Sequence, residues 1–309
     1  MIHRSAKRQL LLVLITLVLS CALIFSPDAY LPMLARAFML WWAVGFGALV
    51  LLAAWRRMWW WALANCIAAP LVLLQVGTPV AAQVRATNAL GLRIAHMNVL
   101  QPNDDHAEAI ASVLATNADL ISVQEVSPEW AAALRSGLAH QYPYQHIVPN
   151  DNCYGIALFS KLPFAQVSTI SSAGAPFIEA MIDVGGSRVR VYAVHATSPI
   201  SYAHFRRRNS QLTELAERVR RGAMPTLIVG DLNTVHWDGA YVRFCARSGA
   251  RPINSPYQIT WPSIGPLAMI PLDHALVSGG LSPQGISTFK VQGSDHRGLL
   301  AEVRLPHAR

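Results

Sequence analysis

Residues 227–233 read LIVGDLN, a short apolar run that ends in an acid and an amide. Residues 120–125 read LISVQE and follow the same plan, while residues 293–297 read GSDHR and set an acid beside a histidine. Acidic groups at strand ends, with an imidazole nearby, suit a divalent cation and a phosphate better than they suit a packed core. The three stretches together indicate metal-assisted hydrolysis of a phosphoester.

Three apolar runs lie in the N-terminal part of the chain. The segments at about 9–26, 36–55 and 58–76 are each long enough to cross a hydrocarbon core, which needs roughly 20 helical residues. A cleaved signal peptide would resemble the first run, and buried core helices would explain all three. Tryptophan favours the membrane–water interface, however, so the clusters at 41–42 and 59–61 favour three transmembrane helices.

Basic residues set the expected orientation of these spans. Residues 4–8 carry three basic side chains, and Arg56 and Arg57 join the second span to the third. The positive-inside rule places both groups in the cytoplasm. With three crossings, the rest of the chain then lies outside. We therefore expect a multi-pass protein of a bacterial inner membrane, with its large domain on the periplasmic or extracellular side.

The net charge of +8 is concentrated before residue 77. Six of the 25 basic residues but one of the 17 acidic residues lie there, which leaves 19 basic and 16 acidic residues in the remainder. The remainder is only mildly basic, so the charge is weak evidence for nucleic-acid binding. The helix expected at 202–221 carries six arginines, which we interpret as a solvated face or an attraction to anionic lipid headgroups rather than a nucleic-acid surface.

The composition divides the chain into three parts. A membrane anchor at 1–76 is followed by a small, polar linker at 77–91, and one large domain occupies 92–309. In the large domain, short strand-like runs alternate with turn signals, and there are only a few helical segments. Many strands with few helices predict an α/β fold in which two sheets pack face to face with helices outside.

Polar side chains at strand ends are candidates for a metal site. Asn98 ends the first expected strand, where it could ligate a hard cation or support a ligand, although turn chemistry is the usual explanation. Glu125 is either a metal-ligating carboxylate or a first-turn acid favoured by the helix dipole. Asp231 and Asn233 are two residues apart and share a face in extended geometry. That pair suits activation of a water, with an Asx-turn as the alternative.

Histidines stand close to these acids along the chain. His195 ends an apolar strand at a strand-to-loop edge, where its imidazole could donate to a phosphoryl oxygen, although most such histidines belong to the core. Asp273 precedes His274, and Asp295 precedes His296. An aspartate that hydrogen-bonds a histidine fixes its tautomer and favours its charged form. Such a histidine can stabilise the negative charge of a transition state, and a neighbouring aspartate can ligate a metal or hold a water.

These residues belong to an ordered series of short motifs. In chain order they are residues 97–99 (MNV), 124–126 (QEV), 155–163 (GIALFSKLP), 194–195 (VH), Arg208 with Gln211, 230–233 (GDLN), 260–262 (TWP), 272–274 (LDH) and 294–296 (SDH). The series resembles the endonuclease/exonuclease/phosphatase superfamily, a group of deoxyribonuclease-like metal phosphoesterases. The resemblance covers roughly residues 92–305, and chance agreement of the whole ordered series is improbable.

The resemblance implies a four-layered α/β sandwich with Mg²⁺ or Mn²⁺ as cofactor, and it implies a role for each matching residue. The metal-binding residues would be Asn98, Glu125 and Asp295. The catalytic residues would be His195, Asp231, Asn233, Asp273 and His296, with Asp273 orienting His296. The substrate-binding residues would be Asn233, His195 and Arg208.

Two departures from the family pattern leave the substrate contacts open. Ala196 stands where a leucine often follows the strand histidine, and Arg297-Gly298 follows His296 where a small residue and a proline are common. The implied activity is attack of an activated water on a phosphodiester or a phosphomonoester. The substrate would be a nucleic acid, a phospholipid headgroup of sphingomyelin type, or a phosphoinositide-like phosphate.

Two further classes of protein remain as alternatives. A membrane-anchored binding protein without activity is disfavoured, because each expected catalytic position holds a competent residue. A transporter is disfavoured, because the three expected spans carry no charged residue at mid-depth. The expected partners are therefore the phosphoester substrate and the lipid bilayer, and the sequence gives no indication of an oligomeric state.

Overall fold

The computed structural model describes residues 2–77, 91–222, 224–264 and 269–305. The chain divides into two compact units, Met1–Pro79 with Val235–Gly239, and Val80–Thr234 with Ala240–Arg309. The linker expected at 77–91 lies, apart from its two end residues, outside the described residues.

The first unit is helical. Its helices are α1 (Ile2–Phe25), α2 (Tyr30–Ala37), α3 (Met39–Trp55) and α4 (Trp59–Leu74). Of the 27 large apolar side chains that are exposed in the described residues, 21 lie on these four helices. A soluble monomer rarely exposes apolar side chains in such a concentration, so this surface is of the kind that contacts lipid or another protein.

The structure corrects the expectation of three membrane spans. Within the described residues, α1 alone is a single helix long and apolar enough to cross a membrane, over Ala6–Phe25. The second expected span is two helices, α2 and α3, bent by 63°; at the break, the N–H of Phe38 bonds the carbonyl groups of Ala35 and Arg36 and closes α2. The third, α4, has 16 residues, about 24 Å at 1.5 Å per residue, which is shorter than a hydrocarbon core of about 30 Å.

The second unit contains two six-stranded sheets, which pack face to face. The first has the order β11-β12-β1-β2-β4-β3, and the second has the order β5-β6-β7-β8-β10-β9. The strands of the first sheet are β1 (Gly91–Asn98), β2 (Leu120–Gln124), β3 (Tyr144–Val148), β4 (Ile156–Ser160), β11 (Ser282–Lys290) and β12 (Arg297–Arg304). Those of the second are β5 (Phe164–Ser172), β6 (Ala175–Val184), β7 (Ser187–His195), β8 (Thr226–Asp231), β9 (Arg251–Pro252) and β10 (Asp273–Ser278).

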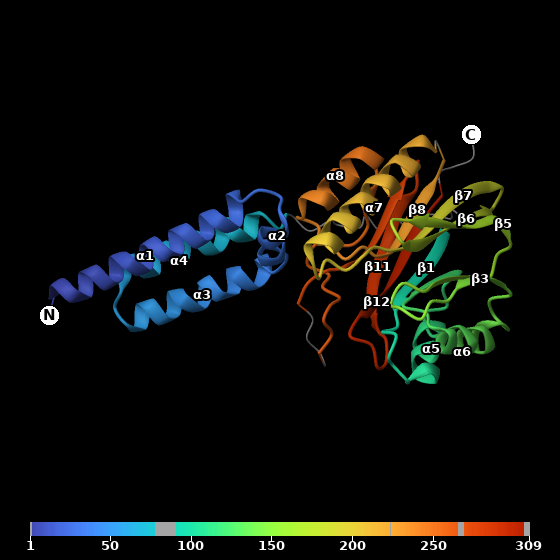
Figure 1. Ribbon diagram of the computed structural model, residues 1–309, viewed down its shortest axis with the longest axis horizontal. Coiled ribbons are helices and arrows are strands. Elements are labelled where there is room, and N and C mark those ends of the chain that lie inside the picture. Colours follow the sequence, from blue (N-terminus) through green and yellow to red (C-terminus); the bar gives the residue numbers. More distant parts are fainter. Residues whose placement is uncertain (1, 78–90, 223, 265–268, 306–309) are drawn as a thin grey trace. The chain divides into compact units, whose positions relative to one another are not determined.

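Helices cover the outer face of each sheet. Helices α5 (His106–Leu114) and α6 (Pro128–Leu138) pack on the first sheet, and α7 (Tyr202–Arg221) and α8 (Gly239–Ser248) pack on the second (Figure 1). Ser127 caps α6 by accepting a bond from the N–H of Trp130, and Ser201 caps α7 in the same way through His204. The layers therefore run helices, sheet, sheet, helices, which is the expected α/β sandwich.

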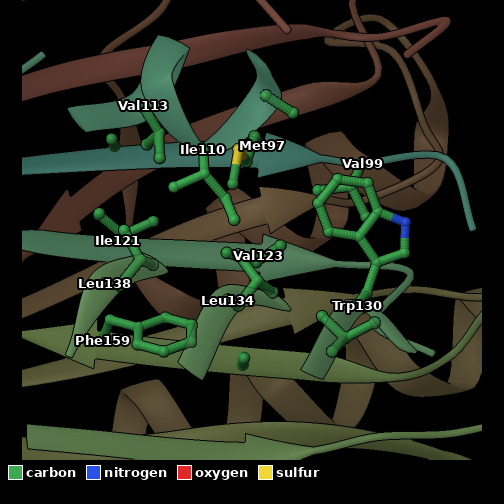
Figure 2. Close-up of a cluster of buried hydrophobic side chains, with 14 of the residues drawn as sticks. Met97, Val99, Ile110, Val113, Ile121, Val123, Trp130, Leu134, Leu138 and Phe159 are labelled. Carbon is green, nitrogen blue, oxygen red and sulfur yellow. The ribbon is translucent and has the colours of Figure 1, made fainter. Parts of the chain in front are cut away.

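Side chains of β1 alternate between two apolar cores, one on each face of the first sheet. Met97 of β1 and Val99, just after it, face α5 and α6, where they meet Ile110, Trp130 and other buried side chains (Figure 2). Leu92 and Ile94 face the opposite way, into the layer between the two sheets. Successive side chains of a strand point to opposite faces, so every second residue of β1 reaches the interior between the sheets.

Each sheet contains one parallel pair of strands, joined by a helix. In the first sheet β1 runs parallel to β2 through α5, and in the second β7 runs parallel to β8 through α7. All other pairs are antiparallel, including β12 with β1 and β10 with β8. An antiparallel strand begins beside the end of its neighbour, so the starts of β12 and β10 lie beside the ends of β1 and β8.

The packing of α6 on the first sheet can be tested by substitution of a buried side chain. Leu134 of α6 is fully buried among the side chains in Figure 2. Leu134→Ala leaves a cavity there, and we expect it to lower the free energy of unfolding by about 2–5 kcal/mol. The matched control is Val242→Ala on α8, where the side chain is 52% exposed and the cost should be slight. Chemical denaturation followed by near-ultraviolet circular dichroism measures both, and equal losses would contradict this packing.

Candidate active site

A group of polar side chains occupies one end of the apolar layer between the sheets. On β1, His96 and Asn98 continue the inward-facing row. On the second sheet, His195, Asp231 and Asp273 end the inward-facing rows of β7, β8 and β10, and their Cα atoms are register partners across the three strands. The same alternation that fills the core thus brings polar groups of both sheets together where the apolar rows stop.

Asp273 joins the two sheets through two imidazoles. Its Oδ1 lies 2.6 Å from Nε2 of His96 on β1, and its Oδ2 lies 2.9 Å from Nδ1 of His296, just before β12. The carboxylate is fully buried. Burial alone would raise the pKa of Asp273, but the charge and hydrogen bond of His296, with those of His96, hold it below its usual range. Asp273 is therefore an anion that orients both rings.

The Oδ2 atom of Asp231 lies between the imidazoles of His195 and His296. Oδ1 is held by the backbone N–H of Asn233 at 2.8 Å. Oδ2 lies 3.7 Å from Nε2 of His296 and 3.8 Å from Nε2 of His195. These separations are too long for direct hydrogen bonds and are of the size that a bridging water or a phosphoryl oxygen spans. Three polar atoms thus point at one place, where a reacting group could sit.

The side chains of Asp231, His296 and His195 differ in their charge. Burial, and then the neighbouring Asp273 carboxylate, raise the pKa of Asp231 to about 8. Burial disfavours the charged form of His296, yet the charge and hydrogen bond of Asp273 raise its pKa to about 10. Burial, and then the nearby His296, lower the pKa of His195 to about 3. The site therefore contains a cationic imidazole and a neutral imidazole beside an aspartate that can exchange a proton near neutral pH.

Glu125 and Asp231 converge on the amide of Asn98. Its Nδ2 donates to Glu125 Oε1 at 2.9 Å and to Asp231 Oδ2 at 3.3 Å, while its Oδ1 accepts from the N–H of Leu100. The N–H of Gln101 fixes the other oxygen of Glu125 at 2.9 Å. In this orientation Asn98 supports the acids as a donor, and its role as a metal ligand stays a prediction.

Asp295 lies at the edge of this group. Its Oδ2 accepts from Nε1 of Trp261 at 2.8 Å, while its Oδ1 is buried without a hydrogen-bond partner among the described residues. A buried carboxylate oxygen without a partner is costly, and a hard cation is one group that would satisfy it. The donor set of carboxylates and an amide thus fits Mg²⁺ or Mn²⁺.

A compact group of possible ligand atoms among the described residues differs from the predicted metal set. Asp231, Asp273 and His296 offer atoms within 4.8 Å of one another. Both oxygens of Asp273 already accept from imidazoles, however, and Nδ1 of His296 is occupied by the same carboxylate. Asp273 is therefore poorly suited to hold a cation, and the ligand set Asn98, Glu125 and Asp295 stays a prediction.

Backbone strain is concentrated at the same place. Leu100, Glu125 and Asn233 have φ angles of 59°, 64° and 48°, in the left-handed region that residues other than glycine seldom adopt. Gly230 has a φ of 151°, and a Cβ atom there would lie 1.8 Å from the carbonyl oxygen of Val194. Such strain persists where the surroundings impose it, typically at functional sites. Here it turns the chain sharply after β2 and around the end of β8.

Arg208 lies against the turn that follows Asp231. The side chain is fully buried in α7, and one terminal nitrogen donates to the backbone carbonyl of Asn233 at 3.0 Å. The side chain of Asn233 in turn donates to the carbonyl of Ala196 at 2.9 Å. Arg208 therefore positions the turn that follows Asp231, and its direct contact with substrate stays a prediction.

Two residues of the site were not expected from the sequence. His96 bonds Asp273, and the ring of Tyr154 lies 5.6 Å from that of His195 between centroids. The spacing of two between His96 and Asn98 was a usable signal, because it places both on one strand face. Tyr154 lies in the turn before β4, where no periodicity marks it.

Comparison with known proteins gives the family. The model of the Endonuclease/Exonuclease/phosphatase family matches residues 88–296. No curated protein matches the chain in sequence. Solved structures of 14–18% identity share the fold over 68–70% of this chain.

Three solved structures illustrate this likeness. An endonuclease/exonuclease/phosphatase from Beutenbergia cavernae has a TM-score of 0.57 at 18% identity, over 70% of this chain and 72% of that one. TDP2 from D. rerio, complexed with a single-strand DNA product, has 0.58 at 14% identity, over 70% and 99%. A beta toxin from Staphylococcus aureus has 0.54 at 18% identity, over 68% and 99%.

The family match spans the strands and loops that carry Asn98, Glu125, Asp231 and His296. More than half of the chain lies within it. The chain therefore belongs to the Endonuclease/Exonuclease/phosphatase family.

Proposed function

We propose that the second unit is a divalent-metal-dependent phosphoesterase that cleaves a phosphodiester by attack of an activated water. One observation carries the proposal: Asp231, His195 and His296 direct Oδ2 and two Nε2 atoms at one point, with separations of 3.7 and 3.8 Å. Members of the family generally hydrolyse phosphoester bonds, which agrees with this geometry.

The chain's own residues supply a base and two donors. Asp231, with a pKa raised by burial, accepts a proton from the attacking water near neutral pH. His296 is charged, and its Nε2–H faces the point where negative charge develops on the phosphoryl oxygens. His195 is neutral and donates through Nε2 to a second oxygen. Asn233 fixes the carboxylate of Asp231 through its backbone N–H.

Glu125 would hold the cation, together with the free oxygen of Asp295 or the oxygen of Asn98 after the amide has turned, so that Oδ2 of Asp231 stays available for the water's proton. A bound divalent ion polarises the phosphoryl group and lowers the pKa of a coordinated water. The bond from Gln101 N–H holds the Glu125 carboxylate in place before the ion arrives. Because the carboxylate is already held in place, binding of the ion would require little rearrangement of the Glu125 side chain.

A lipid headgroup is the second candidate for the substrate, beside nucleic acid. The observation that favours it is the first unit, whose helices carry 21 of the 27 exposed large apolar side chains. A catalytic domain tethered to a bilayer meets phospholipid at a high local concentration. A panel of plasmid DNA, single-stranded DNA, phospholipid vesicles and inositol phosphates discriminates between the candidates.

We also propose that α1 attaches the protein to a bacterial inner membrane. Its basic start, at Arg4, Lys7 and Arg8, favours the cytoplasmic side, and its apolar stretch from Ala6 to Phe25 is long enough to cross. Helices α3 and α4 would bury their exposed apolar side chains in the same bilayer. The catalytic unit would then face the periplasm or the exterior.

Two substitutions test the reaction centre. Asp231→Asn removes the base and His296→Asn removes the charged donor. We expect each to lower kcat by about 10²–10⁴-fold, the usual effect of losing such a group. The assay is hydrolysis of bis(p-nitrophenyl) phosphate with Mg²⁺ or Mn²⁺, and chelation of the metal should abolish turnover reversibly.

Matched controls are Asp183→Asn and His140→Asn. Asp183 forms an exposed ion pair with Arg188 at the far end of β6, and His140 is exposed after α6. Both should retain the activity of the unmodified protein. Full activity of Asp231→Asn, or activity that survives complete metal removal, would contradict the proposed mechanism.

The pH profile tests the charge on His296. Its pKa is raised, so the charged form is present below about pH 10 and is lost as the pH rises through that value. Asp273→Asn removes the anion that raises this pKa, which should then fall towards or below an ordinary histidine value of about 6.5. We expect the normalised kcat of the variant to decline at a lower pH than that of the unmodified protein. Identical profiles between pH 6 and 9.5 would contradict the assignment.

Protease accessibility tests the proposed location. In Gram-negative cells that express the chain with a C-terminal tag, we expect the protein in the carbonate-washed membrane fraction. Proteinase K added to spheroplasts should remove the tag, while a cytoplasmic marker stays intact. Release of the protein by carbonate would contradict attachment, and a protected tag would contradict the orientation.

A further inference from the structure

We propose that His96 is a positioning residue for the reaction: it fixes the carboxylate of Asp273 in the plane from which that carboxylate aims His296 at the reaction centre. This inference rests on the proposed function and adds to it a residue of β1 that touches neither substrate nor metal. The expected chemistry of the family assigned no role to this position.

The contacts of Asp273 carry the inference. Its two oxygens are bonded by different rings, Oδ1 by His96 Nε2 at 2.6 Å and Oδ2 by His296 Nδ1 at 2.9 Å. A carboxylate held at one oxygen can rotate about its Cβ–Cγ bond. A second donor on the other oxygen fixes the plane of the group, and with it the direction of the bond to His296. Nε2 of His296 then stays aimed at Asp231 Oδ2, 3.7 Å away.

The environment of His96 argues against a role in packing alone. The preceding inward-facing positions of β1 are Leu92 and Ile94, which contribute to the apolar layer. His96 is fully buried, and its Nδ1 has no hydrogen-bond partner among the described residues. A buried polar atom without a partner costs stability. A leucine would fill this position at less cost, so the imidazole is explained by its bond to Asp273.

The alternative is that His96 only ties the sheets together. Its strand belongs to the first sheet and Asp273 belongs to the second, so their bond crosses the interior between the sheets. Such a tie would contribute to stability whether or not His296 is present. A positioning role acts through His296 and therefore disappears when His296 is removed. The two roles are separable by comparing the same substitution in two backgrounds.

The experiment uses the full chain, Mg²⁺ and bis(p-nitrophenyl) phosphate. His96→Leu removes the donor, and His96→Gln places an amide N–H near the position of Nε2. We expect His96→Leu to lower kcat about 10-fold or more with KM changed less than twofold, as for other residues that orient a catalytic group. His96→Gln should recover most of the loss. In a His296→Asn background, His96→Leu should cause no further loss.

His106→Leu is the matched control. His106 is a partly buried histidine on α5 whose ring packs on Trp130 at 4.2 Å between centroids, in the helix layer on the outer face of the first sheet. It should leave kcat unchanged. If His96→Leu does not fold, the comparison of His96→Gln with His96→Asn replaces it. The asparagine side chain is too short to reach Asp273, so we expect His96→Asn to be less active than His96→Gln.

Four outcomes would overturn the inference: an unchanged kcat in His96→Leu, a rise in KM alone, equal losses in both backgrounds, or equal activity of the Gln and Asn variants. Inactivity of the unmodified protein on every substrate would instead overturn the proposed function. In that case the ring ¹⁵N resonances of His296 still decide. We expect the His296 ring resonances to shift in His96→Leu, and unchanged resonances would contradict the positioning role.

Discussion

The direction of the strands is the constraint on which the site depends. Asn98 ends β1 and Glu125 follows β2, which is parallel to it. His195 and Asp231 end the parallel strands β7 and β8. Asp273 begins β10, antiparallel to β8, and the residues before β12 enter beside the end of β1. Every polar group is thus carried to one edge of the layer between the sheets. Convergence of residues nearly 200 positions apart therefore follows from pairing rather than from loop conformation.

Burial at that edge sets the chemistry. Asp231 and Asp273 are register partners on adjacent strands, and both lie almost or fully out of solvent. Two like charges so placed disfavour each other's ionised form, and the rings of His96 and His296 resolve the conflict in favour of Asp273. Asp231, bonded instead by a backbone N–H, remains the group with the raised pKa. Two chemically identical side chains therefore acquire different roles.

Much of this arrangement was predictable from the sequence, because the alternation of apolar and polar residues along a strand and the polar residues at strand ends are local signals. The strands, the βαβ segments and the sandwich follow from them. The two-residue β9 is too short to show a period, whereas α8 was overlooked although its buried residues Ala240, Tyr241, Phe244 and Ser248 recur at helical spacing. The three-span expectation was wrong because hydropathy counts apolar residues but does not detect a helix end at Phe38. His96 was missed because its partner, Asp273, is 177 residues away and only pairing of the sheets brings them together.

The origin of the site in both sheets has a consequence for the newly made chain. The imidazole of His296 and the flanking strand β12 emerge last among these elements, and β12 pairs with β1, the first strand of the unit. Closing this contact requires almost the whole unit to have been synthesised, and contacts of such sequence separation form slowly. A nascent chain that ends before β12 consequently lacks the contacts that hold His296 against Asp273 and Asp231, so this group of side chains is completed only when synthesis of the unit is nearly finished.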